Sequence, residues 1–126
     1  MATPQKLARL LLLQQRLKKL HEAKQAAFLR EASAAEREAA EIAEQLQNPA
    51  GLSALFPDLY HNRIGRALAR CDSNREKAAQ ESTKILEADA RAKMVENAHR
   101  EALRKSERAD EEKAILELLQ AVKAGN

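Results

Sequence analysis

Apolar side chains recur every three or four residues along the first part of the chain, which is the spacing of a helix that packs along one face. Two such series are present, and they are Leu10, Leu13, Leu17 and Leu20, followed by Phe28, Ala32, Ala35, Ala39, Ile42 and Leu46. Each has heptad spacing, but an eleven-residue step joins them. The pattern predicts a coiled-coil helix whose supercoil unwinds locally around Lys24.

The second half of the chain carries a comparable heptad series. A strict seven-residue track and a companion track form its predicted seam. The track contains Cys71, Ala78, Ile85, Ala92, His99, Ser106 and Lys113, and the companions are Leu68, Arg75 and Ser82 before Ile85, then Ala88, Val95, Ala102, Ala109 and Leu116. We therefore expect the seam to drift once in this helix as well.

Strong helix-breaking residues gather at one place along the chain. Two of the three prolines and the first glycine lie close together, which predicts a turn. Near the start, Thr3 followed by Pro4 suits a helix N-cap with proline at the first helical position. The predicted elements are a helix over about residues 4–47, a turn over about 48–57 and a helix over about 58–122.

The short connection predicts that the two helices fold back on each other in antiparallel fashion. The expected fold is all-α, a long antiparallel two-helix coiled coil (α-hairpin) that forms a single domain over residues 1–126. Because the second helix is the longer by about 20 residues, we expect its C-terminal end to project as a single helix. Ser73 and Glu76 have the spacing of a capping box, which leaves open a break at residues 72–74.

Composition agrees with long helices and argues against an enclosed active site. Of the 126 residues, 44% are hydrophobic and 33% are charged, whereas aromatic residues make up only 2%. So few large side chains cannot build a thick core, and we expect no enzymatic activity. The single cysteine, Cys71, excludes an internal disulfide and suits a reducing cytosol. We expect neither a signal peptide nor a membrane span.

The chemical groups of the chain form no recognisable catalytic or metal-binding set. His21, His61 and His99 lack the spacing of metal ligands. No glycine-rich phosphate loop is present. Paired acidic residues are abundant, but a chain with 19 of them shows such pairs on any solvated helix face. We therefore predict no catalytic residue, no metal and no cofactor.

Both ends of the chain carry more large apolar side chains than one partner helix can cover. The leucines at residues 10–13 span about 300° of the helix circumference, and the apolar residues of 115–122 also spread over more than one stripe. In an antiparallel hairpin these two segments lie toward the same end, which is rich in lysine and arginine. Apolar surface with a basic rim predicts a docking site for another protein. Ordinary surface leucines or self-association are the alternatives.

Two further features bear on partners. The turn region carries two of the three aromatic residues, Phe56 and Tyr60, which either anchor an interface or close the apolar tip of the hairpin. A net charge of +3 leaves open a basic coiled-coil arm that binds RNA. Acidic residues interleave with basic ones along most of the chain, which disfavours RNA because phosphate binding needs a continuous basic stripe.

Three segments of the chain resemble the FliJ family, the stalk proteins of flagellar and related type III secretion export ATPases. They are the N-terminal helix from Lys6 to Leu17 that runs into the alanine- and glutamate-rich stretch 34–41, the aromatic-containing re-entry 56–64, and the charged run 100–113. The resemblance is one of size, layout and composition, and it covers nearly the whole chain. It implies an antiparallel coil similar to the central stalk of rotary ATP synthases.

The resemblance also implies partners and a location. Stalks of this family insert their joined N- and C-terminal ends into the export ATPase hexamer, contact the membrane export gate and can escort export chaperones. They work in the cytoplasm, associated peripherally with the inner-membrane export apparatus. The positions expected at the ATPase ring are Leu7, Arg9, Leu11, Leu12, Arg16, Arg104, Arg108 and Leu118. The positions expected at the gate are Leu59, Tyr60, Ile64 and Leu68. The implied function is a non-enzymatic stalk or adaptor, with an RNA-binding arm or a self-associating scaffold as alternatives.

Overall fold

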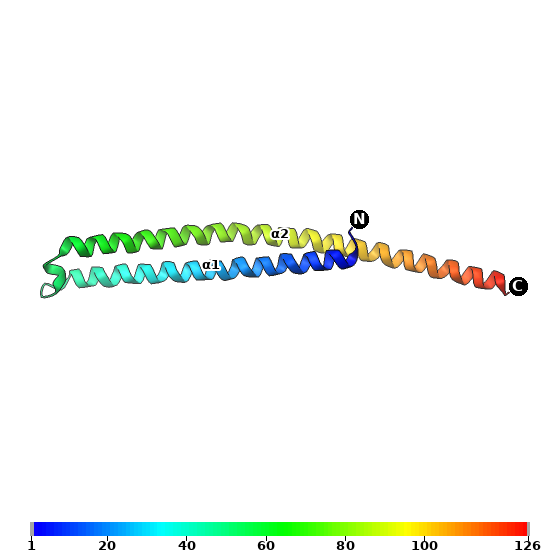
Figure 1. Ribbon diagram of the computed structural model, residues 1–126, viewed down its shortest axis with the longest axis horizontal. Helices are drawn as coiled ribbons and strands as arrows, with labels where there is room; N and C mark the ends of the chain where they lie inside the picture. Colours follow the sequence, from blue (N-terminus) through cyan, green and yellow to red (C-terminus); the bar gives the residue numbers. More distant parts are fainter. Residues whose placement is uncertain (1, 126) are drawn as a thin grey trace. The chain divides into compact units, whose positions relative to one another are not determined.

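A computed structural model describes residues 2–125 and shows a helical hairpin (Figure 1). Its elements are helix α1 (Pro4–Leu46), the short 3-10 helix η1 (Leu52–Ala54) and helix α2 (Pro57–Ala124). The two long helices pack together, and the described residues contain no strand. The predicted all-α hairpin is therefore confirmed, with α2 starting and ending within two residues of the predicted bounds.

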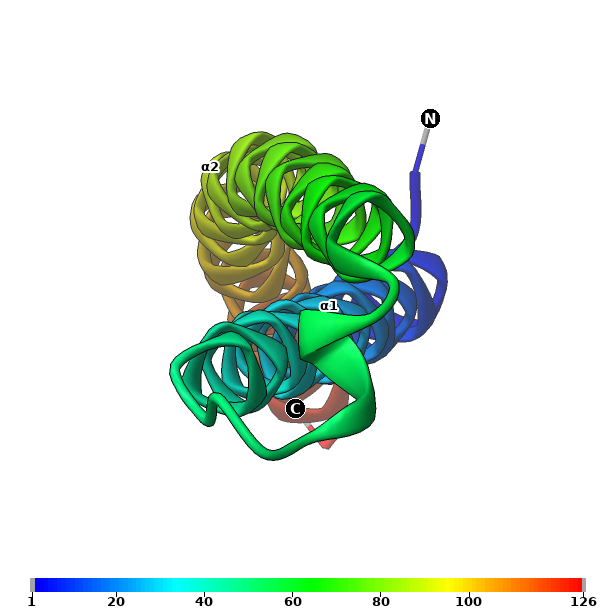
Figure 2. The ribbon, with the colours of Figure 1, turned by 90° about the vertical axis from the view of Figure 1, so that its left-hand side faces the viewer.

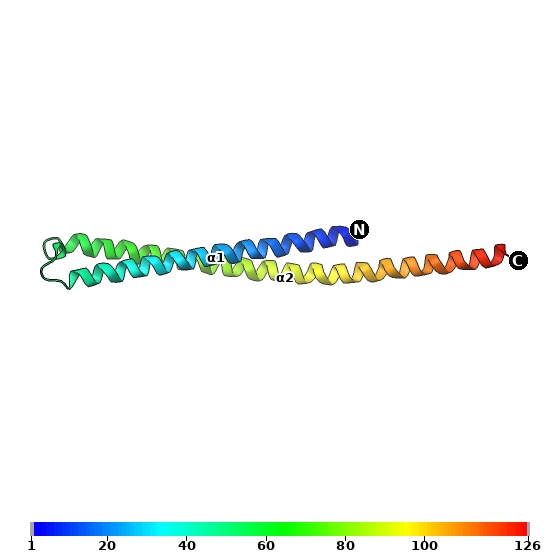
Figure 3. The ribbon, with the colours of Figure 1, turned by 90° about the horizontal axis from the view of Figure 1, so that it is seen from below.

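Two compact units make up the chain, and each takes a part from both helices. One unit comprises residues 1–16 and 88–126, and the other comprises residues 17–87. In the 17–87 unit, α1 and α2 lie side by side and run in opposite directions, as Figures 1 and 3 both show. The turn between the helices belongs to this unit.

The first helix begins where the sequence predicts it. The backbone N–H of Lys6 donates to Thr3 Oγ1 at 3.2 Å, and the N–H of Leu7 donates to the Thr3 carbonyl at 3.0 Å. The Thr3 side chain therefore caps a backbone donor that has no partner within the helix. Pro4 follows at a position where its missing N–H costs nothing.

The connection between the helices, which faces the viewer in Figure 2, contains its own hydrogen bonds. Ser53 is buried, and its hydroxyl donates to the carbonyl of Gln45 at 2.7 Å, which satisfies an acceptor at the end of α1. Asn48 Oδ1 accepts the N–H of Ala50 at 3.1 Å, as in an Asx turn. The connection is thus an ordered part of the hairpin.

Within the 17–87 unit the inward-facing positions follow one uninterrupted heptad series on each helix. On α1 they are Lys18, His21, Gln25, Phe28, Ala32, Ala35, Ala39, Ile42 and Leu46, and on α2 they are Tyr60, Ile64, Ala67, Cys71, Asn74, Ala78, Glu81 and Ile85. Steps of three and four alternate throughout, so the predicted eleven-residue step and the predicted drift in the second helix are wrong. Leu20, which was expected in the seam, is 48% exposed, and Ala67 occupies the place predicted for Leu68.

The other unit has its own inward-facing series. Its least exposed positions are Pro4, Leu7, Leu11 and Gln14 on α1, and Ala88, Ala92, Val95, His99 and Ala102 on α2. The predicted companions Ala88, Val95 and Ala102 on α2 are correct, but Leu10 and Leu13 of α1 are exposed. Four consecutive leucines point in directions all around the helix. The sequence of this segment therefore does not show which of them face inward.

The possible helix break at residues 72–74 does not occur. These residues lie in the uninterrupted α2 helix, and Asn74 Nδ2 donates back to the carbonyl of Arg70 at 2.9 Å. Asn74 also has the inward-facing phase of the heptad series, between Cys71 and Ala78. Because α2 is continuous across this point, the arginines near the turn keep a fixed angular position relative to the rest of the helix.

Candidate docking surfaces

Two polar pairs join α1 to α2 in the 17–87 unit, and three of their four residues, His21, Gln25 and Glu81, occupy inward-facing positions. His21 Nδ1 lies 2.6 Å from Glu81 Oε2, and Gln25 Nε2 donates to Ser82 Oγ at 2.5 Å. Lys84 Nζ lies 3.5 Å from the other Glu81 oxygen. These partners are about 60 residues apart in the chain, so the spacing of histidines alone gave no sign of them. Mispairing the helices would leave the buried carboxylate of Glu81 and the partly buried groups of His21, Gln25 and Ser82 without these partners, which favours a single register.

The pKa of Glu81 is set by opposing effects. Burial of the carboxyl group raises its pKa, because burial disfavours the charged form. The hydrogen bond with His21 and the electrostatic interactions with Lys84 and His21 lower the pKa, and together they prevail. The pKa of Glu81 therefore lies below its ordinary value of 4.5, and the side chain is a carboxylate at neutral pH.

The residues expected at the ATPase ring all lie in the unit formed by residues 1–16 and 88–126, but on two different kinds of surface. Leu7 and Leu11 are half-buried inward-facing residues, whereas Leu12 is exposed. The expected residues that are both exposed and charged are Arg9, Arg16, Arg104 and Arg108. The C-terminal part of α2 continues past the N-terminal end of α1 (Figures 1 and 3). Leu118 belongs to this C-terminal segment of α2 and is exposed.

This continuation of α2 carries an apolar stripe of its own. Every described residue from 103 to 125 is exposed. Ile115, Leu118, Leu119 and Val122 are spaced as on one face of a helix, and each is more than half exposed. At 100° per residue their mean direction is about half a turn away from His99 and Ala102. The stripe is therefore a separate surface and no continuation of the seam.

The residues expected at the export gate do not form one surface. Tyr60 and Ile64 are half-buried inward-facing residues. Leu59 and Leu68 are exposed, but they are separated by nine residues, which is two and a half turns of helix. They consequently lie on opposite sides of α2, and only one of them can contribute to any single contact.

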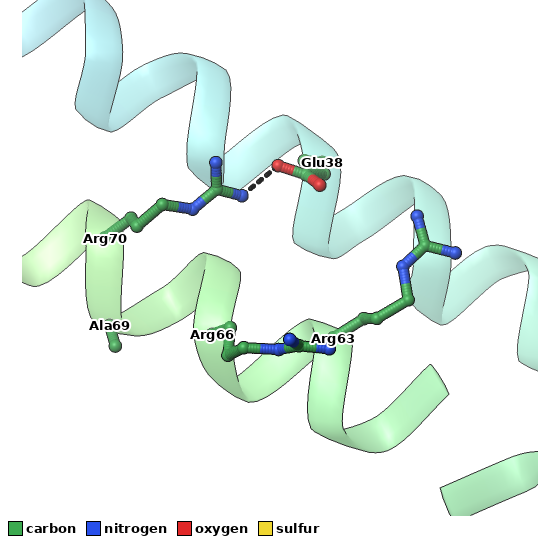
Figure 4. Close-up of a pocket in the computed structure, with 5 residues that line it drawn as sticks. All are labelled: Glu38, Arg63, Arg66, Ala69 and Arg70. Carbon is green, nitrogen blue, oxygen red and sulfur yellow. Dashed lines mark hydrogen bonds and ion pairs between the residues drawn. The ribbon is translucent and has the colours of Figure 1, made fainter. Parts of the chain in front are cut away.

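A shallow hollow lined by arginine lies beside the turn (Figure 4). Arg63, Arg66, Ala69 and Arg70 of α2 line it together with Glu38 of α1. The guanidinium group of Arg70 makes an ion pair with Glu38 across the hollow, and the guanidinium carbon of Arg63 lies 5.7 Å from the centroid of the Tyr60 ring. Sequence reasoning missed this cluster, although its spacing of three and four residues was a signal for one helix face.

The described residues contain no group of three or more His, Cys, Asp or Glu side chains placed to hold a metal ion. No helix among them has the length and apolarity needed to cross a bilayer. No protein-family model, curated protein or solved structure matches this chain.

Proposed function

We propose that this protein is a non-enzymatic coiled-coil stalk or adaptor of a flagellar or type III protein export apparatus. In this role it binds the export ATPase hexamer through the unit formed by residues 1–16 and 88–126. It couples that ring to the membrane export gate and can escort export chaperones. The sequence resemblance to FliJ proteins supplies the identity of these partners. ATP hydrolysis belongs to the ATPase.

One observation carries the proposal, namely the unpaired C-terminal part of α2. A helix that exposes Ile115, Leu118, Leu119 and Val122 on one face leaves apolar area in water that a binding partner can cover. Arg104 and Arg108 precede this face on the same exposed segment. An apolar stripe accompanied by arginine suits a partner surface that combines apolar and acidic side chains.

ATP turnover by a purified candidate export ATPase, measured with and without this protein, tests the proposal. We expect stimulation by the native chain and its loss in a variant with Arg9, Arg16, Arg104 and Arg108 changed to Glu. Because those arginines lie on both helices, the double variant Arg104→Glu/Arg108→Glu then isolates the contribution of α2.

A control matched to Arg104→Glu/Arg108→Glu is Arg30→Glu/Arg37→Glu. It makes the same change in net charge as that double variant, at exposed positions of α1 in the 17–87 unit. It should stimulate the ATPase as the native chain does. Equal loss in the control would mean that net charge and not a specific contact is responsible. Absence of both stimulation and binding at every concentration of the native chain would refute the proposal.

A self-associating scaffold is the second candidate function, because the same apolar stripe could be covered by a second copy of α2. The variant Leu118→Gln/Leu119→Gln separates the two functions. A scaffold would fall from dimer to monomer in sedimentation equilibrium. A stalk would keep its mass and lose ATPase stimulation.

A further inference from the structure

Two rows of opposite charge run along one side of the hairpin in the 17–87 unit. Arg63, Arg66 and Arg70 follow one another on α2 at steps of three and four residues, and Glu38 and Glu41 are three residues apart on α1. Residues at these steps share one face of a helix. The ion pair between Arg70 and Glu38 shows that the two faces border the same side of the hairpin.

The charges of these rows are only partly satisfied within the hairpin. Arg70 is paired with Glu38. Arg63 lies against the Tyr60 ring, and neither Arg66 nor Glu41 makes an ion pair with any residue of 2–125. Both side chains are exposed. One guanidinium and one carboxylate therefore lie unpaired on the same side of the molecule.

Arg66 and Glu41 also lie at the same height along the hairpin. Arg66 is one turn from Arg70 toward the turn of the hairpin, and Glu41 is about one turn from Glu38 in the same spatial direction, because the helices are antiparallel. A second copy rotated by 180° about an axis parallel to the helices would place its α1 over the first copy's α2. Arg66 of each copy would then meet Glu41 of the other without any shift in register.

We propose that this side of the 17–87 unit binds a second copy of the chain, with the two hairpins parallel and their turns at the same end. A two-fold axis across the helices would instead place α1 over α1 and oppose Glu41 to Glu41. Charge therefore selects the parallel arrangement.

Apolar residues at the turn support the same arrangement. Leu55, Phe56 and Leu59 are each more than half exposed. Leu59 lies one turn before Arg63 and thus borders the same side of α2. With both turns at one end, these side chains of the two copies come together and leave water. The apolar contact supplies affinity, and the reciprocal pairs of Arg66 with Glu41 set the orientation.

A second copy fits the face better than nucleic acid does. A phosphate backbone that followed the arginine row would run beside Glu38 and Glu41, whose charges repel it. A second copy instead places a single carboxylate, that of Glu41, opposite Arg66. This inference uses residues 38–70 only and is independent of the proposed role of the C-terminal stripe.

Sedimentation equilibrium of the full chain over a range of concentrations in low salt tests the proposal. We expect a monomer–dimer equilibrium for the native chain. Arg66→Glu alone and Glu41→Arg alone should each weaken dimerisation at least about tenfold, because each places two like charges together at both symmetry-related contacts. A mixture of the two variants should recover a dimer, because each mixed pair restores one Arg66–Glu41 contact and one contact of reversed sign.

The mixture protects the test against variants that merely fail to fold, because misfolded chains do not complement each other. Arg30→Glu is a matched control that should leave the dimer unchanged, and circular dichroism verifies the helix content of each variant. A native chain that stays monomeric at every concentration would overturn the proposal. So would a dimer that survives both charge reversals but is lost in Leu118→Gln/Leu119→Gln, which would locate self-association at the C-terminal stripe.

Discussion

The uninterrupted heptad series makes opposite predictions for two aliphatic residues of α1. Ile42 is 3% exposed in the seam, whereas Leu20 is 48% exposed outside it. Truncation to Ala removes three carbon atoms from either side chain, worth about 2.4 kcal/mol when all three are buried. Helix propensity returns a few tenths of this, because Ala is the best helix former.

We therefore expect Ile42→Ala to lower the free energy of unfolding by about 2 kcal/mol. This is the lower end of the range for core truncations, because a seam between two helices borders water and leaves little enclosed cavity. Leu20→Ala should cost no more than about 1 kcal/mol, since half of the side chain is already in water. For a chain of this size these losses correspond to drops in Tm of about 6–10 °C and less than 5 °C.

Thermal and urea unfolding followed by circular dichroism at the helix band measures both variants under identical conditions. The two variants leave charge unchanged and lie on the same helix, so each serves as the control for the other. A loss in Leu20→Ala equal to that in Ile42→Ala would refute the heptad assignment. It would restore the seam through Leu17 and Leu20 that the leucine spacing suggested.

Three other predictions concern local contacts. Glu81→Gln should flatten the dependence of Tm on pH. The lowered pKa of Glu81 gives the native protein stability that is present above the ordinary pKa of 4.5 and is lost as pH falls through the pKa of the folded state. Values of Tm measured from pH 7 to pH 3 for the native protein and the variant should therefore converge at the acid end. Gly65→Ala should raise the free energy of unfolding in urea by up to about 1 kcal/mol, since a Cβ at this helical position meets no atom within 4 Å, and a decrease would contradict that reasoning. Ser53→Ala should lower the same quantity by about 1 kcal/mol, because the carbonyl of Gln45 loses its buried donor; an unchanged urea midpoint would show that water replaces the hydroxyl.

Much of the fold follows from the sequence, and the reasons are local. The breaker cluster in residues 48–57 and the absence of strong breakers elsewhere define two helices and one turn. Thr3 and Pro4 define the start of α1 through capping chemistry. These features act over a few residues, so each can be recognised without knowledge of the partner helix.

The phase of the seam is a non-local property. It was predicted correctly from Phe28 to Leu46 and wrongly before Phe28. Leucine is the strongest signal in a hydrophobic pattern, and it drew the expected seam to Leu17 and Leu20. Of these two, Leu17 is half-buried and Leu20 is exposed. The structure instead keeps one helical phase from Phe28 back to His21, because polar side chains there find partners on α2. Glu81 lies 60 residues from His21, so their mutual satisfaction is visible only once the helices are paired.

The candidate sites show the same difference between features that depend on one helix and features that depend on helix pairing. The exposure of the C-terminal stripe follows from the unequal helix lengths, which the sequence predicts. The hollow lined by arginine depends on how α1 and α2 are aligned, because Glu38 and Arg70 come from different helices. Surfaces built from one helix can thus be predicted from periodicity, and surfaces built from two require the pairing.

The position of Cys71 has a consequence for how the motions of the hairpin can be observed. Cys71 is 2% exposed and packs with Ala32 and Ala35 of α1. A bulky alkylating reagent can reach the sulfur only while the helices are apart at this level, so the labelling rate reports the frequency of that separation. Comparison with the rate for the unfolded chain converts it into a free energy of local opening. The native chain therefore carries a natural labelling site at the middle of its 17–87 unit. A change in the labelling rate on adding a partner would show whether binding makes separation of the helices less frequent or more frequent.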